Sequence, residues 1–212
     1  GIGVNTRFVK EEIDSWEALW DPKYRGRIAM LNDPQEVFAV ALKLLGYSAN
    51  TRDLEALQEA RDLLIEQKPL VLTYDSDNTN HLLAAGEVWL AHGYSGDVLM
   101  AADVNPDIVY VVPKEGGLMW MDVMAIPKGA RNVDAALKFI DFILRPDVSA
   151  RLTQVIHYPN PNRGAHEYLD PEVLSDPAIY PPQDVMERME WIEDLGELAP
   201  VVDRLWTEVK VE

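Results

Sequence analysis

The sequence contains no cysteine, no long apolar run and comparatively little positive charge. Without cysteine the chain forms no disulfide, no thiolate metal site and no cysteine nucleophile. A transmembrane helix needs about 18 or more consecutive apolar residues, whereas the longest apolar run, Val37–Leu42, ends after six. The 19 Lys and Arg residues face 36 Asp and Glu residues, a formal charge of −17. A chain with this charge would be repelled by the phosphates of nucleic acid.

What the sequence does contain suits a folded protein. Its 212 residues are 48% apolar and 26% charged, which is enough to build one domain or two small lobes around a core. The acidic charge is concentrated, because residues 163–212 hold 13 acids and four bases and so carry −9 of the −17. Two interpretations stay open: a solubilising acidic surface on helices, or a field that attracts a cationic ligand.

Predicted strands and helices alternate over the first two thirds of the chain. Apolar segments predict strands over 1–5, 28–31, 70–74, 88–92, 108–112 and 118–126, with helices over 15–20, 34–45, 53–67, 78–86 and 94–102. Such alternation favours an α/β lobe with a largely parallel sheet. The chain opens inside an apolar strand and without a Met, so we expect it to be a fragment of something longer.

The last third is predicted to be helical. Helices are expected over 133–144, 148–156, 184–195 and 199–209, with a proline-rich stretch that contains no strand over 158–182. No internal repeat and no low-complexity segment is present.

Asp33 and Glu36 form the first candidate pair. Asp33 suits a helix N-cap, Pro34 the first helical position and Glu36 the third, so both acids would complement the free amides and the helix dipole. The alternative is functional, because the two carboxylates also follow a predicted strand, at the edge where open α/β sheets collect ligands.

Trp120 and Asp122 form the second pair. If they lie on a strand they share one face, and a lone carboxylate in an apolar strand is costly to bury unless it is paired. Asp122 then either caps a loop or faces a cleft and meets a cation. We favour the cleft, because an acid beside an aromatic face suits an ammonium group.

Other candidates are less specific. Ser76 and Tyr94 each lie between a predicted strand and a helix, where turns and ligand sites are both common, and Tyr158 precedes two prolines. His92 and His157 lie outside any metal-binding spacing, and neither a glycine-rich phosphate loop nor a Gly-x-Ser-x-Gly elbow occurs. We therefore expect no catalytic residue, no metal and no cofactor. Paired carboxylates could serve a glycoside hydrolase, but any acidic protein offers such pairs.

Taken together, several segments resemble the spermidine/putrescine-binding proteins of bacterial ABC importers, in one register over essentially the whole chain. The resemblance is carried by residues 15–20 (SWEALW), 32–38 (NDPQEVF), 45–48 (LGYS), 76–78 (SDN), 113–122 (PKEGGLMWMD), 125–127 (AIP), 142–148 (FILRPDV) and 158–162 (YPNPN).

The resemblance implies an α/β, periplasmic-binding-protein-like (type II) lobe with a mixed, largely parallel sheet plus C-terminal helices. It implies a second lobe with its first crossover strand over 1–117, a crossover strand and helices over 118–165, and helices returning to the second lobe over 166–212. The 118–165 segment would normally pack on an N-terminal first lobe. Four of its apolar side chains would then need that lobe or a second copy of the chain as partner: Leu137, Phe139, Ile140 and Ile143.

Carried over position by position, the resemblance places ligand contacts at Asp33, Glu36, Ser76, Tyr94, Trp120, Asp122 and Tyr158. The family has Trp at position 94 and Gln at position 192, where this chain has Tyr94 and Ile192. The implied ligand is a polyamine, the implied partner an ABC transporter permease, and the implied location periplasmic or extracellular, lipid-anchored in Gram-positive bacteria. A receptor for another small solute is the alternative within the same architecture.

Overall fold

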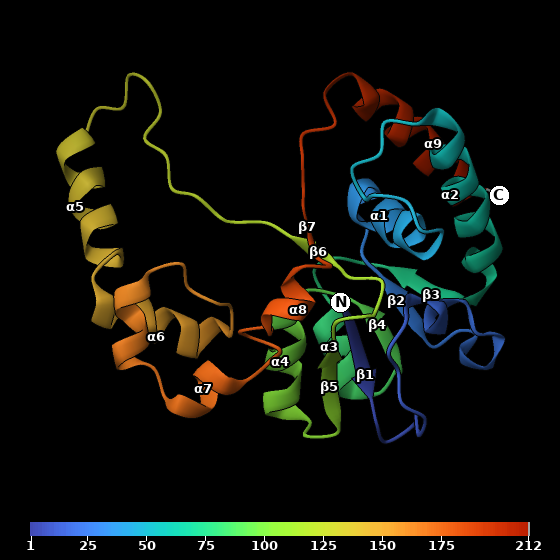
Figure 1. Cartoon of the computed structure of the whole chain (residues 1–212), viewed down its shortest axis with the longest axis horizontal. Helices are drawn as coiled ribbons and strands as arrows, with labels where there is room; N and C mark the ends of the chain where they lie inside the picture. Colours follow the sequence, from blue (N-terminus) through green and yellow to red (C-terminus); the bar gives the residue numbers. More distant parts are fainter. Residues whose placement is uncertain (212) are drawn as a thin grey trace. The chain divides into compact units, whose positions relative to one another are not determined.

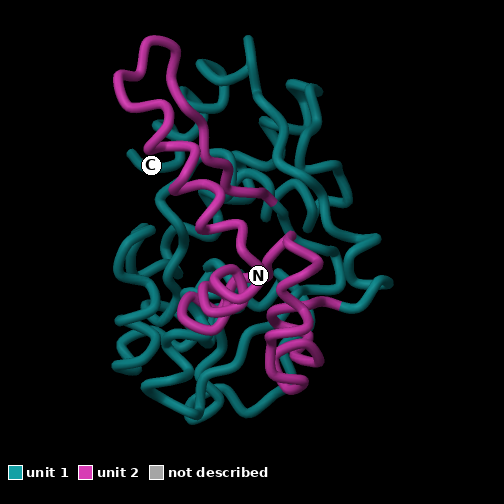
Figure 2. The backbone as a smooth tube through the Cα atoms, turned by 90° about the vertical axis from the view of Figure 1, so that its left-hand side faces the viewer, with its two compact units in different colours: residues 1–119, 182–212 teal, residues 120–181 magenta. Residues whose placement is uncertain are grey.

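A computed structural model describes residues 1–211, which fall into two compact units. Unit 1 comprises residues 1–119 and the C-terminal residues from 182 onward, and unit 2 comprises residues 120–181. Figure 2 distinguishes them by colour. None of the described helices is both long and apolar enough to cross a membrane.

Unit 1 is built on a five-stranded sheet with the strand order β3-β2-β4-β1-β5. β1 pairs antiparallel with both β4 and β5, whereas β2 pairs parallel with β3 and β4. Four strands therefore run in one direction and only β1 opposes them, which confirms the predicted mixed, largely parallel sheet. The strands are β1 Ile2–Asn5, β2 Ile28–Met30, β3 Val71–Tyr74, β4 Leu90–His92 and β5 Ile108–Val111.

Helices cover both faces of this sheet (Figure 1). The helices α1 (Pro34–Leu44), α2 (Leu54–Gln67) and α9 (Ala199–Val211) share one apolar cluster with alternate residues of β1, β2 and β4. The helices α3 (Thr79–Ala85) and α4 (Ser95–Val104) pack against Ala29, Ala91 and Ile108 in a second cluster. Short 3-10 helices lie at 16–20, 22–24, 68–70 and 196–198. The result is the three-layer arrangement expected of an α/β lobe.

Unit 2 is helical and has a small core. It contains α5 (Val133–Ile143), α6 (Pro146–Ile156), a 3-10 helix at 163–168 and α7 (Pro171–Ser175). The buried apolar residues Ala150, Ala165 and Leu169 hold α6 against the segment that follows it. Residues 166–181 pack in this unit, although the sequence suggested grouping them with the C-terminal helices.

Two predicted elements are wrong. Residues 120–126 are not a strand: only Leu118–Met119 (β6) is extended and paired, and its partner is Glu190–Trp191 (β7), parallel to it. Residues 184–195 are not one helix, because a single turn, α8 (Gln183–Met186), is followed by that short strand. The pairing of β7 with β6 explains the second error, since it holds residues 190–191 in a strand. The first error arises because residues 120–126 pair with no strand among the described residues.

Candidate ligand-binding site

The carboxyl ends of three neighbouring strands of unit 1 carry four of the predicted site residues. β2, β3 and β4 run in the same direction, so their ends meet at one edge of the sheet. Asp33 and Glu36 follow β2, Ser76 follows β3 and Tyr94 follows β4. Open α/β sheets bind ligands at this edge.

Asp33 fixes the start of α1. Its Oδ1 accepts a hydrogen bond from the backbone N–H of Glu36 at 3.1 Å, and Pro34 occupies the first turn. The predicted capping role of Asp33 is therefore confirmed. The cap also places the Glu36 side chain on the first turn of the helix, directly after the strand.

Glu36 is the buried acid of this edge. Its side chain is 7% exposed, and burial raises its pKa to about 7, with the charge of Asp33 acting in the same direction and the amino group of Gly1 opposing. No Lys or Arg of the described residues forms an ion pair with it. Burial also raises the pKa of Tyr94, and the nearby carboxylates of Glu36 and Asp33 raise it further. The predicted site residues Asp33, Glu36 and Tyr94 therefore interact electrostatically.

Ser76 ties two of these loops together. Its hydroxyl accepts a hydrogen bond from the backbone N–H of Asn32 at 2.9 Å, which joins the loop after β3 to the loop after β2. The preceding Asp75, which we did not predict, accepts hydrogen bonds from Asp77 N and Asn78 N at 2.8 and 3.0 Å. A hydrogen bond from Asn78 is the main reason that the pKa of Asp75 is lowered. The Asp-Ser-Asp-Asn run could have indicated this turn.

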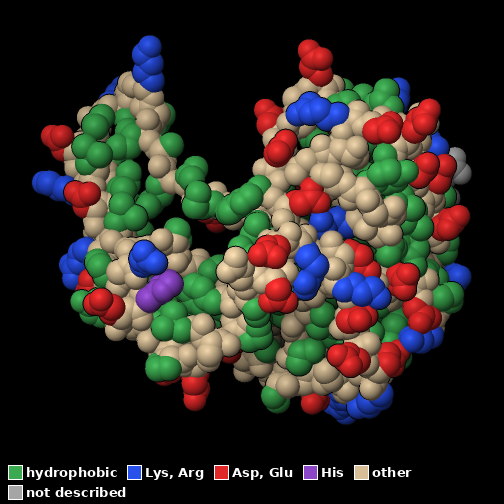
Figure 3. Space-filling view, viewed as in Figure 1, with side chains coloured by type: hydrophobic (Ala, Val, Ile, Leu, Met, Phe, Trp, Pro, Cys, Tyr) green, Lys and Arg blue, Asp and Glu red, His purple; other side chains and the backbone are tan. Residues whose placement is uncertain are grey.

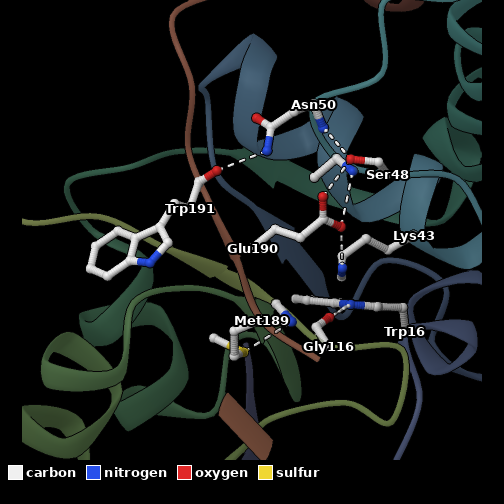
Figure 4. Close-up of polar contacts among 10 residues, drawn as sticks. Trp16, Lys43, Ser48, Asn50, Gly116, Met189, Glu190 and Trp191 are labelled. Carbon is white, nitrogen blue, oxygen red and sulfur yellow. Dashed lines mark hydrogen bonds and ion pairs between the residues drawn. The ribbon is translucent and has the colours of Figure 1, made fainter. Parts of the chain in front are cut away.

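A strap formed by residues 188–195 makes polar contacts with α1 and with the loop after it (Figure 4). Lys43, 8% exposed, forms an ion pair of 2.6 Å with Glu190. The Glu190 carboxylate also accepts hydrogen bonds from Ser48 Oγ and Ala49 N. Burial acts to raise the pKa of Glu190, but the hydrogen bonds from Lys43, Ser48 and Ala49 N hold it below its ordinary value. Since the partners lie 147 positions apart in the chain, no local sequence pattern predicts this pair.

The same strap reaches the first turn of α1. Gln35 Nε2 donates a hydrogen bond of 2.8 Å to the carbonyl of Glu193. Asn50 binds the strap on both sides of Ile192, donating to Trp191 O at 2.8 Å and accepting from Glu193 N at 3.1 Å. The strap is therefore fixed beside the turn that carries Asp33 and Glu36.

Unit 2 carries the other three predicted residues. The rings of Trp120 and Tyr158 lie edge to face, with centroids 6.4 Å apart and planes at 67°. Asp122 is exposed, in an irregular segment. The prediction that it shares a strand face with Trp120 is thus wrong, whereas its role as a ligand contact stays a prediction. Asp122 makes no hydrogen bond or ion pair within the described residues.

One histidine belongs to the core, and no metal-binding group occurs in the described part of the chain. No group of three His, Cys, Asp or Glu side chains is placed to hold a metal ion there. His92 is 3% exposed, and its ring lies edge-on to Trp16 at 5.4 Å. Burial lowers the pKa of His92 well below its ordinary value, so the ring is neutral and belongs to the core.

Known proteins resemble this chain over almost its whole length. The spermidine/putrescine-binding periplasmic protein of Escherichia coli is 39% identical over 210 residues, which are 99% of this chain and 60% of that protein. The putrescine/cadaverine-binding protein of Pseudomonas aeruginosa is 35% identical over 224 residues, 99% of this chain and 63% of that protein. Both are named for binding rather than for catalysis.

A solved structure agrees. The substrate-binding protein of a spermidine/putrescine ABC transporter from Streptococcus pneumoniae superposes with a TM-score of 0.88 at 30% identity, covering 99% of this chain and 65% of that one. This confirms the expected type II binding-protein fold.

A family model also matches most of the chain. The chain spans about 60% of the length of the Escherichia coli protein. A family model described as bacterial extracellular solute-binding protein matches residues 1–181. The chain therefore belongs to the bacterial extracellular solute-binding protein family.

Proposed function

We propose that the chain is the ligand-binding part of the receptor of an ABC importer, and that its ligand is a linear polyamine such as spermidine or putrescine. One observation carries this proposal: Glu36 is a buried carboxyl beside a second acid and a tyrosine, with no Lys or Arg paired to it among the described residues. A buried acid of this kind is stabilised by a cation supplied from outside the chain. The names of the relatives support an amine as that cation.

The residues of unit 1 and unit 2 receive different roles. Asp33 and Glu36 pair with one ammonium group, Tyr94 offers a ring face and the Ser76 hydroxyl accepts a further N–H. Asp122 pairs with a second ammonium group, while Trp120 and Tyr158 flank methylene groups. A linear polyamine carries both ammonium groups and methylene groups, and the proposed role includes no covalent step.

The usual free energies of cation–π contacts and ion pairs indicate how tightly the chain should bind a polyamine. A cation–π contact contributes about 0.5–2 kcal/mol and an exposed ion pair about 0–1 kcal/mol. Since Asp122 and Trp120 are exposed, their contacts gain little unless water is excluded from them. We therefore expect the 212-residue chain alone to bind polyamine weakly.

The proposed function also implies a cellular location and a protein partner. The relatives are named as periplasmic or as substrate-binding proteins of ABC transporters. The receptor would accordingly work outside the cytoplasm and hand its ligand to a membrane permease.

A titration panel tests the ligand class. Spermidine and putrescine are compared with a neutral diol and a dicarboxylate of the same length, using NMR shifts of the chain as the signal. We expect binding of the amines only, weakened in Asp33→Asn, Glu36→Gln and Asp122→Asn. Glu66→Gln removes an exposed acid from the surface of unit 1 and serves as the matched control, with unchanged affinity. Preference for the dicarboxylate would point instead to a receptor for another solute.

A further inference from the structure

Among the described residues, acids and phenols interact with Glu36, and no Lys or Arg side chain acts on it. On its own helix the nearest charge is Asp33, whose Oδ1 binds Glu36 N at 3.1 Å. Across from it, Tyr94 precedes α4 and Tyr110 lies on β5, and the carboxylate of Glu36 raises the pKa of both phenols, after burial as the larger cause. The amino group of Gly1, at the start of β1, is the cationic group that acts on Glu36.

That amino group is a poor counter-ion. It is partly buried and donates to the carbonyl of Gly93 at 3.1 Å, and burial lowers its pKa to about 5. His92, at the end of β4, is neutral for the same reason. Near neutral pH the groups around Glu36 therefore supply no fixed positive charge, and a 7% exposed carboxyl in such a place favours its protonated form.

We propose that Glu36 holds a proton when the site is empty and exchanges it for an ammonium group of the ligand. This inference rests on the proposed function and adds that ligand binding releases the proton of Glu36. The Glu36 O–H bond breaks and its proton leaves to the buffer. The ligand ammonium keeps its own protons, since aliphatic amines have a pKa of about 10, and takes the place of the proton beside the new carboxylate.

The exchange makes binding depend on pH in a definite direction. At pH 6 the ligand must first displace a proton from nearly every molecule, whereas at pH 8 the carboxylate is already ionised. With a folded-state pKa of about 7, affinity is about tenfold weaker at pH 6 than at pH 8 and levels off above that. Burial keeps His92 out of this range, and the loss of the pH dependence in Glu36→Gln is what assigns the change to Glu36.

Two measurements on the intact 212-residue chain test the exchange. The first is a carbon NMR titration of the Glu36 carboxyl without ligand and with saturating spermidine. We expect a midpoint near pH 7 in the empty chain that moves down by more than one pH unit with ligand. The second is calorimetry with spermidine at pH 7 in two buffers of different ionisation enthalpy, where the difference in heat gives the protons released.

Variants separate the exchange from ligand binding as such. Glu36→Gln should bind with a heat that no longer depends on the buffer and an affinity that is flat from pH 6 to pH 8, whereas Glu66→Gln should behave as the parent chain. Binding without buffer dependence, or a Glu36 midpoint near pH 4.5 in the empty chain, overturns the exchange and leaves the proposed function standing. Absence of polyamine binding at every pH overturns the proposed function and the exchange with it.

Discussion

The two units bury their apolar side chains to very different degrees. In unit 1 both faces of the sheet are covered, and residues such as Ile28, Met30, Leu64 and Leu90 are fully buried. In unit 2 only Ala150, Ala165 and Leu169 form an apolar core, and α5 has no buried residue at all. Figure 3 shows hydrophobic side chains gathered on the surface over α5.

The contrast is instructive because α1 and α5 have the same kind of sequence. Both carry apolar residues three and four positions apart, which predicts an amphipathic helix. The apolar stripe of α1 packs on the sheet, whereas Leu137 and Phe139 of α5 are 48% and 57% exposed. Periodicity therefore predicts that a helix forms and which face is apolar, but not what covers that face.

The largest expected difference in stability between the units comes from the same Leu→Ala substitution made once in each unit. Leu90→Ala in β4 removes a fully buried side chain and should cost about 2–5 kcal/mol of unfolding free energy. Leu137→Ala in α5 removes a side chain that is 48% exposed and should change stability by less than about 0.5 kcal/mol. Urea denaturation followed by circular dichroism measures both. Equal losses would show that the α5 face is covered in solution.

A second prediction concerns the buried acid of unit 1. Burial raises the folded-state pKa of Glu36 from 4.5 to about 7, so between these values the folded chain keeps a proton that the unfolded chain has lost. Stability then falls as pH rises through this window. Glu36→Gln removes the penalty and should stabilise the chain by up to about 3 kcal/mol at pH 8, with little effect at pH 4. Denaturation midpoints measured across this range check the sign, with Glu66→Gln as the control.

A smaller effect is expected from the strap of unit 1. Lys43→Met keeps the length of the stem but leaves Glu190 with only Ser48 and Ala49 N as partners. Losing one partner of a mostly buried charged hydrogen bond should cost about 1–3 kcal/mol. Limited proteolysis should cut the strap sooner in this variant than in the parent chain. If Lys43→Met/Glu190→Met is more stable than Lys43→Met alone, the loss comes from the stranded carboxylate, as expected.

Local signals in the sequence were sufficient for most of unit 1. Asp33 caps α1 as its position predicts, and the helix predicted over 53–67 is present as α2, with Asp53 as its N-cap. Prediction failed where distant segments decide the conformation. At Gly116, with φ +83°, an added Cβ would lie 1.9 Å from the carbonyl oxygen of Arg188. This close approach and the pairing of β6 with β7 overrule the helical spacing of residues 184–195, and no sequence window contains both segments.

The candidate site shows the same limit. Sequence reasoning could place Asp33, Glu36, Ser76 and Tyr94 after predicted strands, and the carboxyl ends of parallel strands lie at one edge of a sheet. It could not say which carboxyl is buried. Asp122, which lies in an apolar run, is exposed, whereas Glu36, which looked like part of a helix cap, is 7% exposed. Burial depends on what packs around a residue, and neighbours in sequence do not reveal it.

The smallest expected effect compares ion pairs across the two units. Arg145 and Asp147 of unit 2 make a two-pronged pair, with the closer N–O distance at 2.8 Å and both side chains about half exposed. The hydrogen bond from Arg145 lowers the pKa of Asp147, but solvent screens such a pair. Arg145→Met should therefore leave the denaturation midpoint unchanged, unlike Lys43→Met. A clear loss would mean that the guanidinium also matters through the face of Phe142, 5.6 Å away, and Arg145→Lys would then separate charge from stacking because only arginine stacks on a ring in this planar way.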